Sequence, residues 1–526
     1  MKYLIQVRVY TFVLLTGLLL TTACGGGGKG ISEKLVQIPN DASFVISMDF
    51  KALTSKAKNW KDGLSNFYES LESDPDAPSR ELAMKILDSG FDLKEKAYIF
   101  GKVGAKSKDS YFGVTFLLND PAKLEKAMGE LKDKPEVKKD GAFKYIFNKK
   151  GDGIFGWKGN TGLLIGGEGL KEEKAALALF KKMFATKASE SLGEKNESFR
   201  QVNGKSYDIA FWIDQRRLNE INKESIDALV SVSPILSDLS QISLYTTGGI
   251  NFNNGEVLLE GLSILDKEKS KKFEAVLQNS IQSAVVKASP IKNPSAMVGF
   301  GLGMKAIYEL VKNEESIKQM NDNLQMFDLT AKDMFEMLSG DFFLSTADLK
   351  VNSFFREPET EFVLSIGIAN EKTLDKLLDK LATLQVLKKQ GDYFAVQGPG
   401  NVVVAKKDKA LHFTLTKSLM DNILSGRGGL GSDFQKMANG NSFLFYMNIP
   451  EIYGQVEVVT GGDPVFKKEI IPQMVAVSID AKPINNNQTQ STLKITFTDK
   501  SQNSLAIIGE MIKKAQRQNA PVSMRN

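Results

Sequence analysis

Residues 116–127 read FLLNDPAKLEKA, and residues 366–377 read IGIANEKTLDKL. In each stretch a short apolar strand leads to an Asx residue suited to capping a helix, and an amphipathic helix follows. Apolar residues spaced i, i+3, i+7 mark one buried side of both helices: Leu124, Ala127 and Leu131 in the first, Leu374, Leu377 and Leu381 in the second. The pattern predicts that one strand–cap–helix unit occurs twice.

The same order of elements recurs before and after these two stretches. Residues 42–53 resemble 296–307, and residues 209–214 (IAFWID) resemble 443–448 (FLFYMN). Chance similarity is plausible for one segment, but not for the same order of several segments. The sequence therefore predicts a tandem duplication, with copy 1 at residues 35–287 and copy 2 at residues 288–526, the latter ending in a polar tail.

Strands in both copies alternate apolar and polar residues, as half-buried antiparallel strands do. In residues 410–416 (ALHFTLT), Leu411 and Phe413 share one face, and His412 lies on the opposite, polar face. His412 is therefore interpreted as a bystander. The unbroken run Val402-Val403-Val404 indicates a strand that is covered on both faces.

Helices with amphipathic spacing stand between the strand runs, for example near residues 121–132, 171–185 and 371–388. Hairpin turns rich in glycine and asparagine join many of the strands. We therefore expect an α+β fold of two tandem-duplicated halves, each with a mainly antiparallel sheet and flanking amphipathic helices.

The composition excludes much catalytic chemistry. The chain has 526 residues, of which 42% are hydrophobic and 25% charged, and a formal net charge of +5. Its single cysteine and single histidine cannot build the Cys- and His-rich centres that hold zinc, haem or iron–sulfur clusters. We expect no metal and no cofactor. Lysines and acidic residues interleave instead of forming basic runs with aromatics, so we expect no nucleic-acid partner.

Residues 1–23 have the features of a lipoprotein signal peptide. Lys2 and Arg8 accompany an apolar run that is shorter than the roughly 20 residues a membrane-spanning helix needs. The run ends at Thr21-Thr22-Ala23-Cys24, which resembles a bacterial lipobox, with Thr21 where Leu is common. We expect cleavage before Cys24 and membrane attachment through its thiol, acylated with palmitate or a similar fatty acid. Residues 24–34 are glycine-rich and suited to a tether.

After this tether, residues 38–53 read IPNDASFVISMDFKAL. The Ile-Pro-x-Asp-Ala opening, the strand and the Lys-x-Leu that follow resemble the Bacteroidota cell-envelope lipoproteins grouped as domain of unknown function 4836. The resemblance implies an envelope lipoprotein with no established activity and no catalytic residues to carry over. Glycines and Lys29, not acidic residues, follow Cys24, which favours the periplasmic side of the outer membrane; exposure at the cell surface is the alternative.

Several stretches match catalytic motifs by letter, but their contexts favour structural roles. Residues 151–156 fit G-x-G-x-x-G, yet a strand and turn follow where a dinucleotide site needs a helix. Residues 166–169 (GGEG) lack the Lys-Ser/Thr of a phosphate-binding loop. Ser55-x-x-Lys58 occurs without the other motifs of penicillin-recognising enzymes, so Ser55 is interpreted as a helix cap. Asp74-Pro75-Asp76 lacks the spacing of a calcium loop.

One aromatic pattern distinguishes copy 1 from copy 2. Five rings are spaced at alternate positions on two strands that form a hairpin, and we expect them on one face of it: Phe143, Tyr145, Phe147, Phe155 and Trp157. They are interpreted as sheet packing or, alternatively, as an exposed strip that binds an apolar ligand, a glycan or a partner protein.

Three functions are compatible with these features. The first is non-enzymatic binding or scaffolding by a lipid-anchored envelope protein, because no nucleophile, metal or phosphate motif in the sequence indicates catalysis. The second is a carrier or assembly factor for lipid or outer-membrane components. The third is a carboxylate-dependent hydrolase acting on glycans, which would require buried acidic side chains gathered in one pocket.

Overall fold

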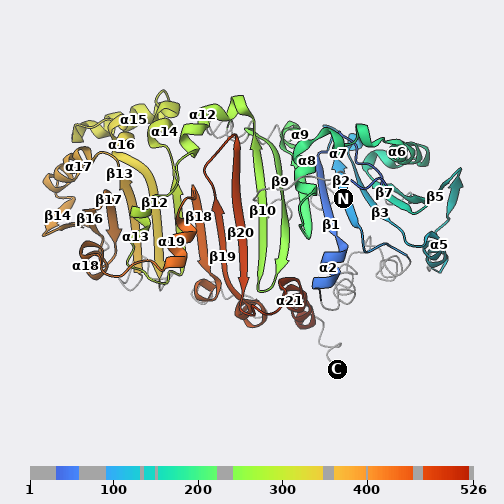
Figure 1. Cartoon of the computed structure of the whole chain (residues 1–526). Helices are drawn as coiled ribbons and strands as arrows, with labels where there is room; N and C mark the ends of the chain where they lie inside the picture. Colours follow the sequence, from blue (N-terminus) through green and yellow to red (C-terminus); the bar gives the residue numbers. More distant parts are fainter. Residues whose placement is uncertain are drawn as a thin grey trace. The chain divides into compact units, whose positions relative to one another are not determined.

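The computed structural model describes residues 31–57, 90–130, 135–148, 152–221, 238, 241–347, 361–398, 401–453 and 466–519. The chain divides into two compact units: unit 1 comprises Met1–Ile264 and Asp499–Asn526, and unit 2 comprises Leu265–Thr498. Both units combine a large antiparallel sheet with helices (Figure 1), which confirms the predicted α+β class.

In unit 1 the strands are ordered β10-β9-β8-β1-β2-β3-β7-β6-β5-β4. Most neighbours along the chain are therefore also neighbours in the sheet, as expected where hairpins join antiparallel strands. The strands are β1 (Phe44–Asp49), β2 (Lys96–Lys102), β3 (Tyr111–Leu117), β4 (Lys138–Asp140), β5 (Phe143–Asn148), β6 (Gly153–Lys158), β7 (Thr161–Gly166), β8 (Ile209–Asp214), β9 (Ser243–Asn253) and β10 (Glu256–Leu265).

In unit 2 the order is β20-β19-β18-β11-β12-β13-β17-β16-β15-β14, which repeats that of unit 1 strand for strand. The strands are β11 (Ala296–Gly301), β12 (Leu338–Ala347), β13 (Glu361–Ile368), β14 (Leu387–Gln390), β15 (Tyr393–Val396), β16 (Val403–Lys407), β17 (Ala410–Thr414), β18 (Phe443–Asn448), β19 (Met474–Ala481) and β20 (Gln488–Phe497).

Backbone hydrogen bonds also correspond between the units. The Ser43 N–H donates to the carbonyl of Gly101 in unit 1, and the Ser295 N–H donates to that of Thr346 in unit 2. Gly101 and Thr346 occupy equivalent places, opposite the first residue of β1 and of β11. Equivalent strands thus begin in the same way in both units.

The helices begin at side chains of the kind that the sequence predicted. Asp120 caps α5 and Asn370 caps α17, each accepting hydrogen bonds from backbone N–H groups of the first turn. In unit 1 the described helices are α2 (Phe50–Lys56), η1 (Ser107–Asp109), α5 (Pro121–Gly129), η2 (Glu168–Leu170), α6 (Glu173–Ala185), η3 (Ala188–Glu190), α7 (Leu192–Lys195), α8 (Glu197–Asn203), α9 (Gln215–Ile221) and α21 (Ser504–Asn519).

In unit 2 the described helices are α12 (Lys267–Leu277), α13 (Ser283–Lys287), α14 (Met304–Val311), α15 (Glu315–Leu324), η4 (Gln325–Phe327), α16 (Ala331–Met337), α17 (Glu371–Thr383), α18 (Lys417–Ser425), α19 (Ser432–Ala438), η5 (Phe466–Ile470) and η6 (Ile471–Gln473). Across the described ranges of both units, no helix is long and apolar enough to cross a bilayer.

The compact units divide the chain at different residues from the predicted copies. Helix α12, near the end of the predicted copy 1, packs on α14 within unit 2. Helix α21, which closes the predicted copy 2, packs on α2 and β9 within unit 1, where the Asn503 amide donates to the carbonyl of Phe252 at 2.7 Å. Contacts therefore assign residues 265–287 to unit 2 and residues 499–526 to unit 1.

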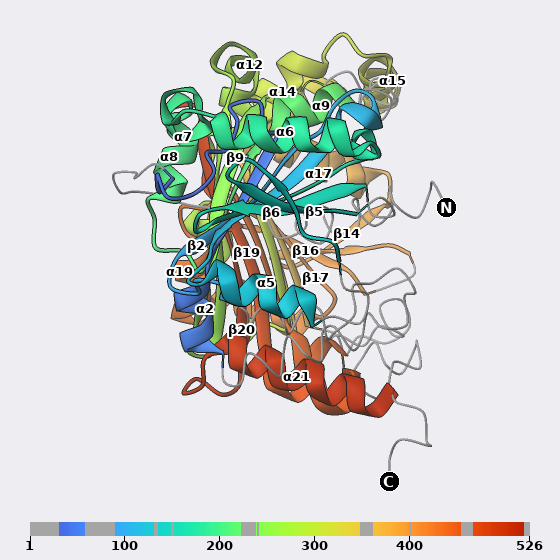
Figure 2. The ribbon, with the colours of Figure 1, turned by 90° about the vertical axis from the view of Figure 1, so that its right-hand side faces the viewer.

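Each sheet has two faces, which we call face A and face B. In unit 1, face A carries Val45, Phe100 and Ile165 and forms the main core with helices α6, α7 and α8. Face B carries Phe116 and Trp157 and packs on α5. Figure 2 shows α6 and α5 on opposite sides of strands β5 and β6.

The register places an apolar row along face B in both units. Residues in the row lie directly opposite each other on adjacent strands, and all of them are half-buried. They are Ile46, Ile99, Val114, Leu164, Phe155 and Ile146 in unit 1, and Ile479, Phe445, Val298, Leu344, Leu364 and Phe413 in unit 2.

The position of His412 shows that the predicted polar face of its strand is the face that helices cover. The alternation on β17 is as predicted, but the face that carries His412 is face A, where helices cover it, and its side chain is fully buried. His412 Nδ1 lies 2.9 Å from Ser365 Oγ, and Nε2 lies 3.2 Å from the carbonyl of Lys407. The polar face is thus the inner one, and the apolar Leu411 and Phe413 are half-buried. Val403 and Val404 are both buried, as the valine run predicted.

Burial lowers the pKa of His412 below its ordinary value of 6.5. Below pH 6.5 the unfolded chain therefore binds a proton that the folded chain does not. We expect the free energy of unfolding to decrease as the pH falls from about 7.5 to about 5.5, by at most about 1.4 kcal/mol per pH unit. Urea denaturation of the wild type and His412→Gln checks this. An equal pH slope in the variant would contradict it, because the chain has only one histidine.

Candidate functional site

The aromatic residues of the predicted strip do not form one surface. Phe143, Tyr145 and Phe147 on β5 belong to the face A core. The ring of Phe143 lies 5.9 Å from that of Phe180 on α6, and the Tyr145 hydroxyl donates to Glu173 at 3.0 Å. Phe143 and Tyr145 therefore hold α6 on the sheet.

Phe155 and Trp157 on β6 point to face B instead. Trp157 lies opposite Lys144 and Phe155 opposite Ile146, so both rings alternate with the aromatic residues of β5. They pack in the cluster of α5, where Phe155 lies 6.0 Å from Phe116. The expected grouping of five rings on one hairpin face is therefore wrong. The register of β5 and β6 differs by one residue from the register that would place the two rings of β6 opposite the aromatic residues of β5.

The other sequence candidates also have structural roles where they are described. Ser55 does not cap its helix: it lies in the last turn of α2, whose N-cap is Asp49. Gly153 begins β6 directly after the turn at Asp152, as a hairpin requires. Cys24 and the Asp74-Pro75-Asp76 stretch lie outside the described residues.

Burial raises the pKa of two carboxyl groups in unit 2, Asp341 on β12 and Asp480 on β19. Strands β11 and β18 separate them in the sheet, so they are three strand spacings apart, roughly 14 Å. Paired glycosidase carboxylates lie about 5–10 Å apart. Asp341 and Asp480 are therefore too distant to act as such a pair. Within the described ranges, no cluster of three potential metal ligands occurs.

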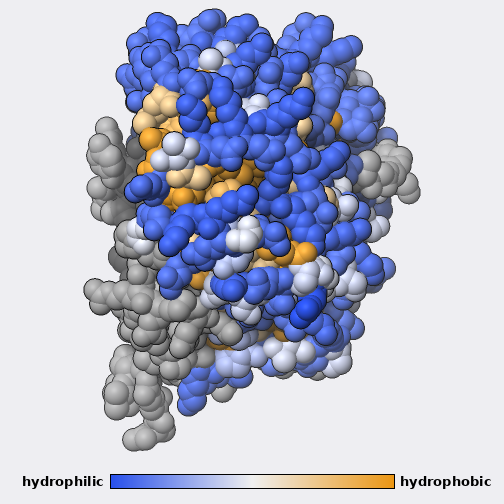
Figure 3. Space-filling model, turned by 90° about the vertical axis from the view of Figure 1, so that its left-hand side faces the viewer, coloured by the Kyte–Doolittle hydropathy of each residue, from blue (hydrophilic) through white to orange (hydrophobic). Residues whose placement is uncertain are grey.

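A different surface gathers exposed apolar side chains, at the end of unit 2 formed by η4, α17 and β14. Met326 is 62% exposed, Leu384 45% and Val386 42%. Asp328, two residues after Met326, pairs with Lys380 at 2.8 Å, so η4 lies beside the C-terminal half of α17. Figure 3 shows an apolar area on this end of unit 2. We call Met326, Leu384, Val386 and the lysines of α17 and β14 the α17–β14 surface.

The end of α17 explains why Leu384 and Val386 are exposed. Leu374 and Leu378 turn the helix toward face B, where they pack with Leu387 and Ile368. The helix ends at Thr383, and Gln385 has a φ of +59°, which reverses the chain before β14. The periodicity of the sequence had predicted a helix to residue 388, which would have placed Leu384 on the buried side.

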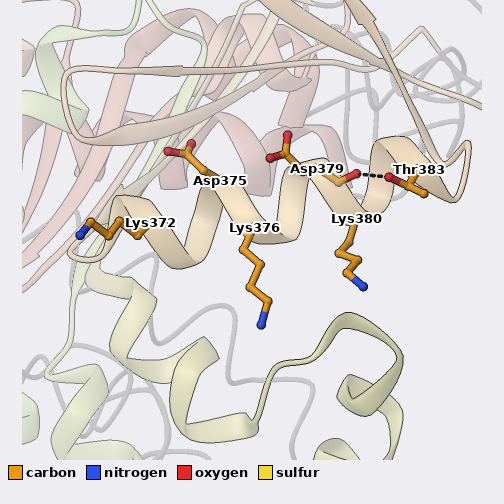
Figure 4. Close-up of a pocket in the computed structure, with 6 residues that line it drawn as sticks. All are labelled: Lys372, Asp375, Lys376, Asp379, Lys380 and Thr383. Carbon is orange, nitrogen blue, oxygen red and sulfur yellow. Dashed lines mark hydrogen bonds between the residues drawn. The ribbon is translucent and has the colours of Figure 1, made fainter.

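Lysines lie on both sides of Leu384 and Val386 in the sequence, on α17 and on β14. Figure 4 shows Lys376 and Lys380 on one side of α17 and Asp375 and Asp379 on the other, around an open hollow lined by the helix. Asp375 pairs with Lys406 at 2.6 Å, and the hydrogen bond from Lys380 lowers the pKa of Asp328. Lys372, Lys388 and Lys389 are exposed.

Two units, each with a ten-stranded antiparallel sheet and helices, define an α+β protein with no recognised catalytic constellation among the described residues. The chain belongs to the family described as a domain of unknown function, DUF4836, whose sequence profile matches residues 36–505. This confirms the family that the Ile-Pro-x-Asp-Ala opening had indicated. None of the curated proteins compared with the chain is significantly similar to it.

Solved structures of TP0453 are distantly similar. Crystal form III is 13% identical, with 44% of this chain and 78% of that chain covered and a TM-score of 0.29. Crystal form IV is 11% identical, with 46% and 85% covered and a TM-score of 0.28. Crystal form I is 11% identical, with 45% and 80% covered and a TM-score of 0.25.

The split of the aromatic strip has a consequence for stability. Trp157 is 3% exposed and fills the cluster under α5, so Trp157→Ala should lower the free energy of unfolding by about 3–5 kcal/mol. Phe112→Ala, at a ring that is 45% exposed in the same unit, should cost about 1 kcal/mol or less. Chemical denaturation measures both, and equal losses would place Trp157 at the surface.

Proposed function

We propose that this protein is a lipid-anchored component of the bacterial cell envelope that binds or scaffolds other envelope components. The observation that carries the binding role is the α17–β14 surface, where Leu384 and Val386 are exposed two residues apart at the end of α17 and Met326 is exposed in η4. Scattered apolar residues are ordinary on protein surfaces, whereas grouped ones mark contact sites. Membership of DUF4836 adds no specific activity.

The anchor rests on the amino-terminal residues. Residues 1–23 are proposed as the signal peptide, Cys24 as the acylated residue, and residues 24–34 as the tether. The Gly-rich sequence after Cys24 supports the periplasmic side of the outer membrane, with surface exposure as the alternative. The identical strand order of units 1 and 2 supports an origin by tandem duplication.

A lipid carrier is the second candidate, and the apolar rows of face B favour it. The side chains of each row are half-buried, large and free of polar atoms. The face of a sheet presents side chains and not backbone donors and acceptors, because the ladder already uses them. Such a surface suits a hydrocarbon chain better than an extended peptide.

Metabolic labelling tests the anchor. Cells that produce the wild-type chain and are fed an alkyne analogue of palmitate should yield a labelled protein in the membrane fraction. Cys24→Ala should lose the label, because the chain has no other cysteine. A wild-type chain without label, or a variant that keeps it, would contradict the proposal.

A further inference from the structure

We propose that the α17–β14 surface docks directly on an anionic lipid bilayer, as a second contact with the membrane besides Cys24. The inference rests on the proposed envelope location and names the partner of the surface. It combines three features of unit 2: exposed apolar side chains, lysines beside them, and an edge strand unsuited to pairing with a peptide.

The apolar side chains are placed as a shallow membrane contact requires. Leu384 and Val386 lie in the turn between α17 and β14, and Met326 lies in η4, where the following Asp328 forms an ion pair with Lys380 of α17. Side chains exposed by 42–62% remain available to acyl chains while the fold stays intact.

The charges complement anionic headgroups. Residues 371–390 hold five lysines and three acidic residues. Two of the acids, Glu371 and Asp375, pair with Lys406, and Asp328, just after η4, pairs with Lys380. Lys372, Lys388 and Lys389 are exposed, and the latter two follow Val386 by two and three residues. Basic residues next to inserted apolar ones are typical of proteins that bind anionic membrane surfaces.

The edge of the sheet argues against a peptide as the partner. Among the described strands, β14 pairs only with β15, so its outer edge could in principle accept another strand. It has only four residues, Leu387–Gln390, and two are exposed lysines. Short edges with lysines are how proteins prevent strand addition. A bilayer needs no backbone pairing and fits the same residues better.

Vesicle binding tests the proposal with the chain from Gly25 onward, which contains every described residue. Wild type should sediment with vesicles of phosphatidylcholine and phosphatidylglycerol, and more weakly with phosphatidylcholine alone or in high salt. Leu384→Ser with Val386→Ser should weaken binding at least about tenfold, and Lys388→Gln with Lys389→Gln about fivefold for each lysine. Phe112→Ser, matched in exposure but in unit 1, should bind as wild type does.

Two results would overturn the proposal: no binding by wild type, or equal binding by the Leu384/Val386 variant with an unchanged melting temperature. A photo-crosslinking residue placed at Val386 in cells distinguishes failure of the lipid assignment from failure of the proposed binding function. An adduct with lipid supports the proposal. An adduct with protein alone, without vesicle binding, overturns the lipid assignment and leaves the binding role intact.

Discussion

Small polar side chains that are buried yet hydrogen-bonded allow helices to pack closely on face A. In unit 2, the hydroxyls of Ser289 and Ser345 lie 2.7 Å apart, and Ser365 is paired with His412. In unit 1, Trp212 donates to Ser198 at 2.8 Å. A buried polar group without its partner costs about 1–3 kcal/mol. These pairs therefore resist a slip of one residue, which would exchange the two faces of a strand.

Because these buried polar side chains fix which residues point to face A, they also fix which large apolar side chains point to face B. Ser345 points into face A, so its neighbour Leu344 must point to face B, where it joins the apolar row. Helix α5 in unit 1 and α17 in unit 2 cover part of this face, and each turns paired apolar residues toward it. Where α17 ends, Leu384 and Val386 continue the apolar character onto the surface.

The sequence was sufficient for the class of fold and for the helix caps, since period-2 strands and Asx caps are local signals. Asp120 and Asn370 cap helices as expected. The sequence was insufficient to predict which face of each strand is covered by helices. Alternation identifies two faces but does not say which of them helices cover, as His412 illustrates. The α17–β14 surface was missed because the apolar spacing through Leu384 continues past the true end of the helix. Gln385, whose φ is positive, carries no strong sequence signal for that reversal.

The most direct test of this account compares two neighbouring positions on β12. The chain from Gly25 onward has no cysteine, so Leu344→Cys and Ser345→Cys each introduce a single thiol. Leu344 is half-buried on face B, whereas Ser345 is fully buried on face A. Under native conditions a maleimide should modify Leu344→Cys much faster, and Ser345→Cys should react only as the protein unfolds. Faster modification of Ser345→Cys would contradict the assignment of face A and face B, and with it the apolar row on face B.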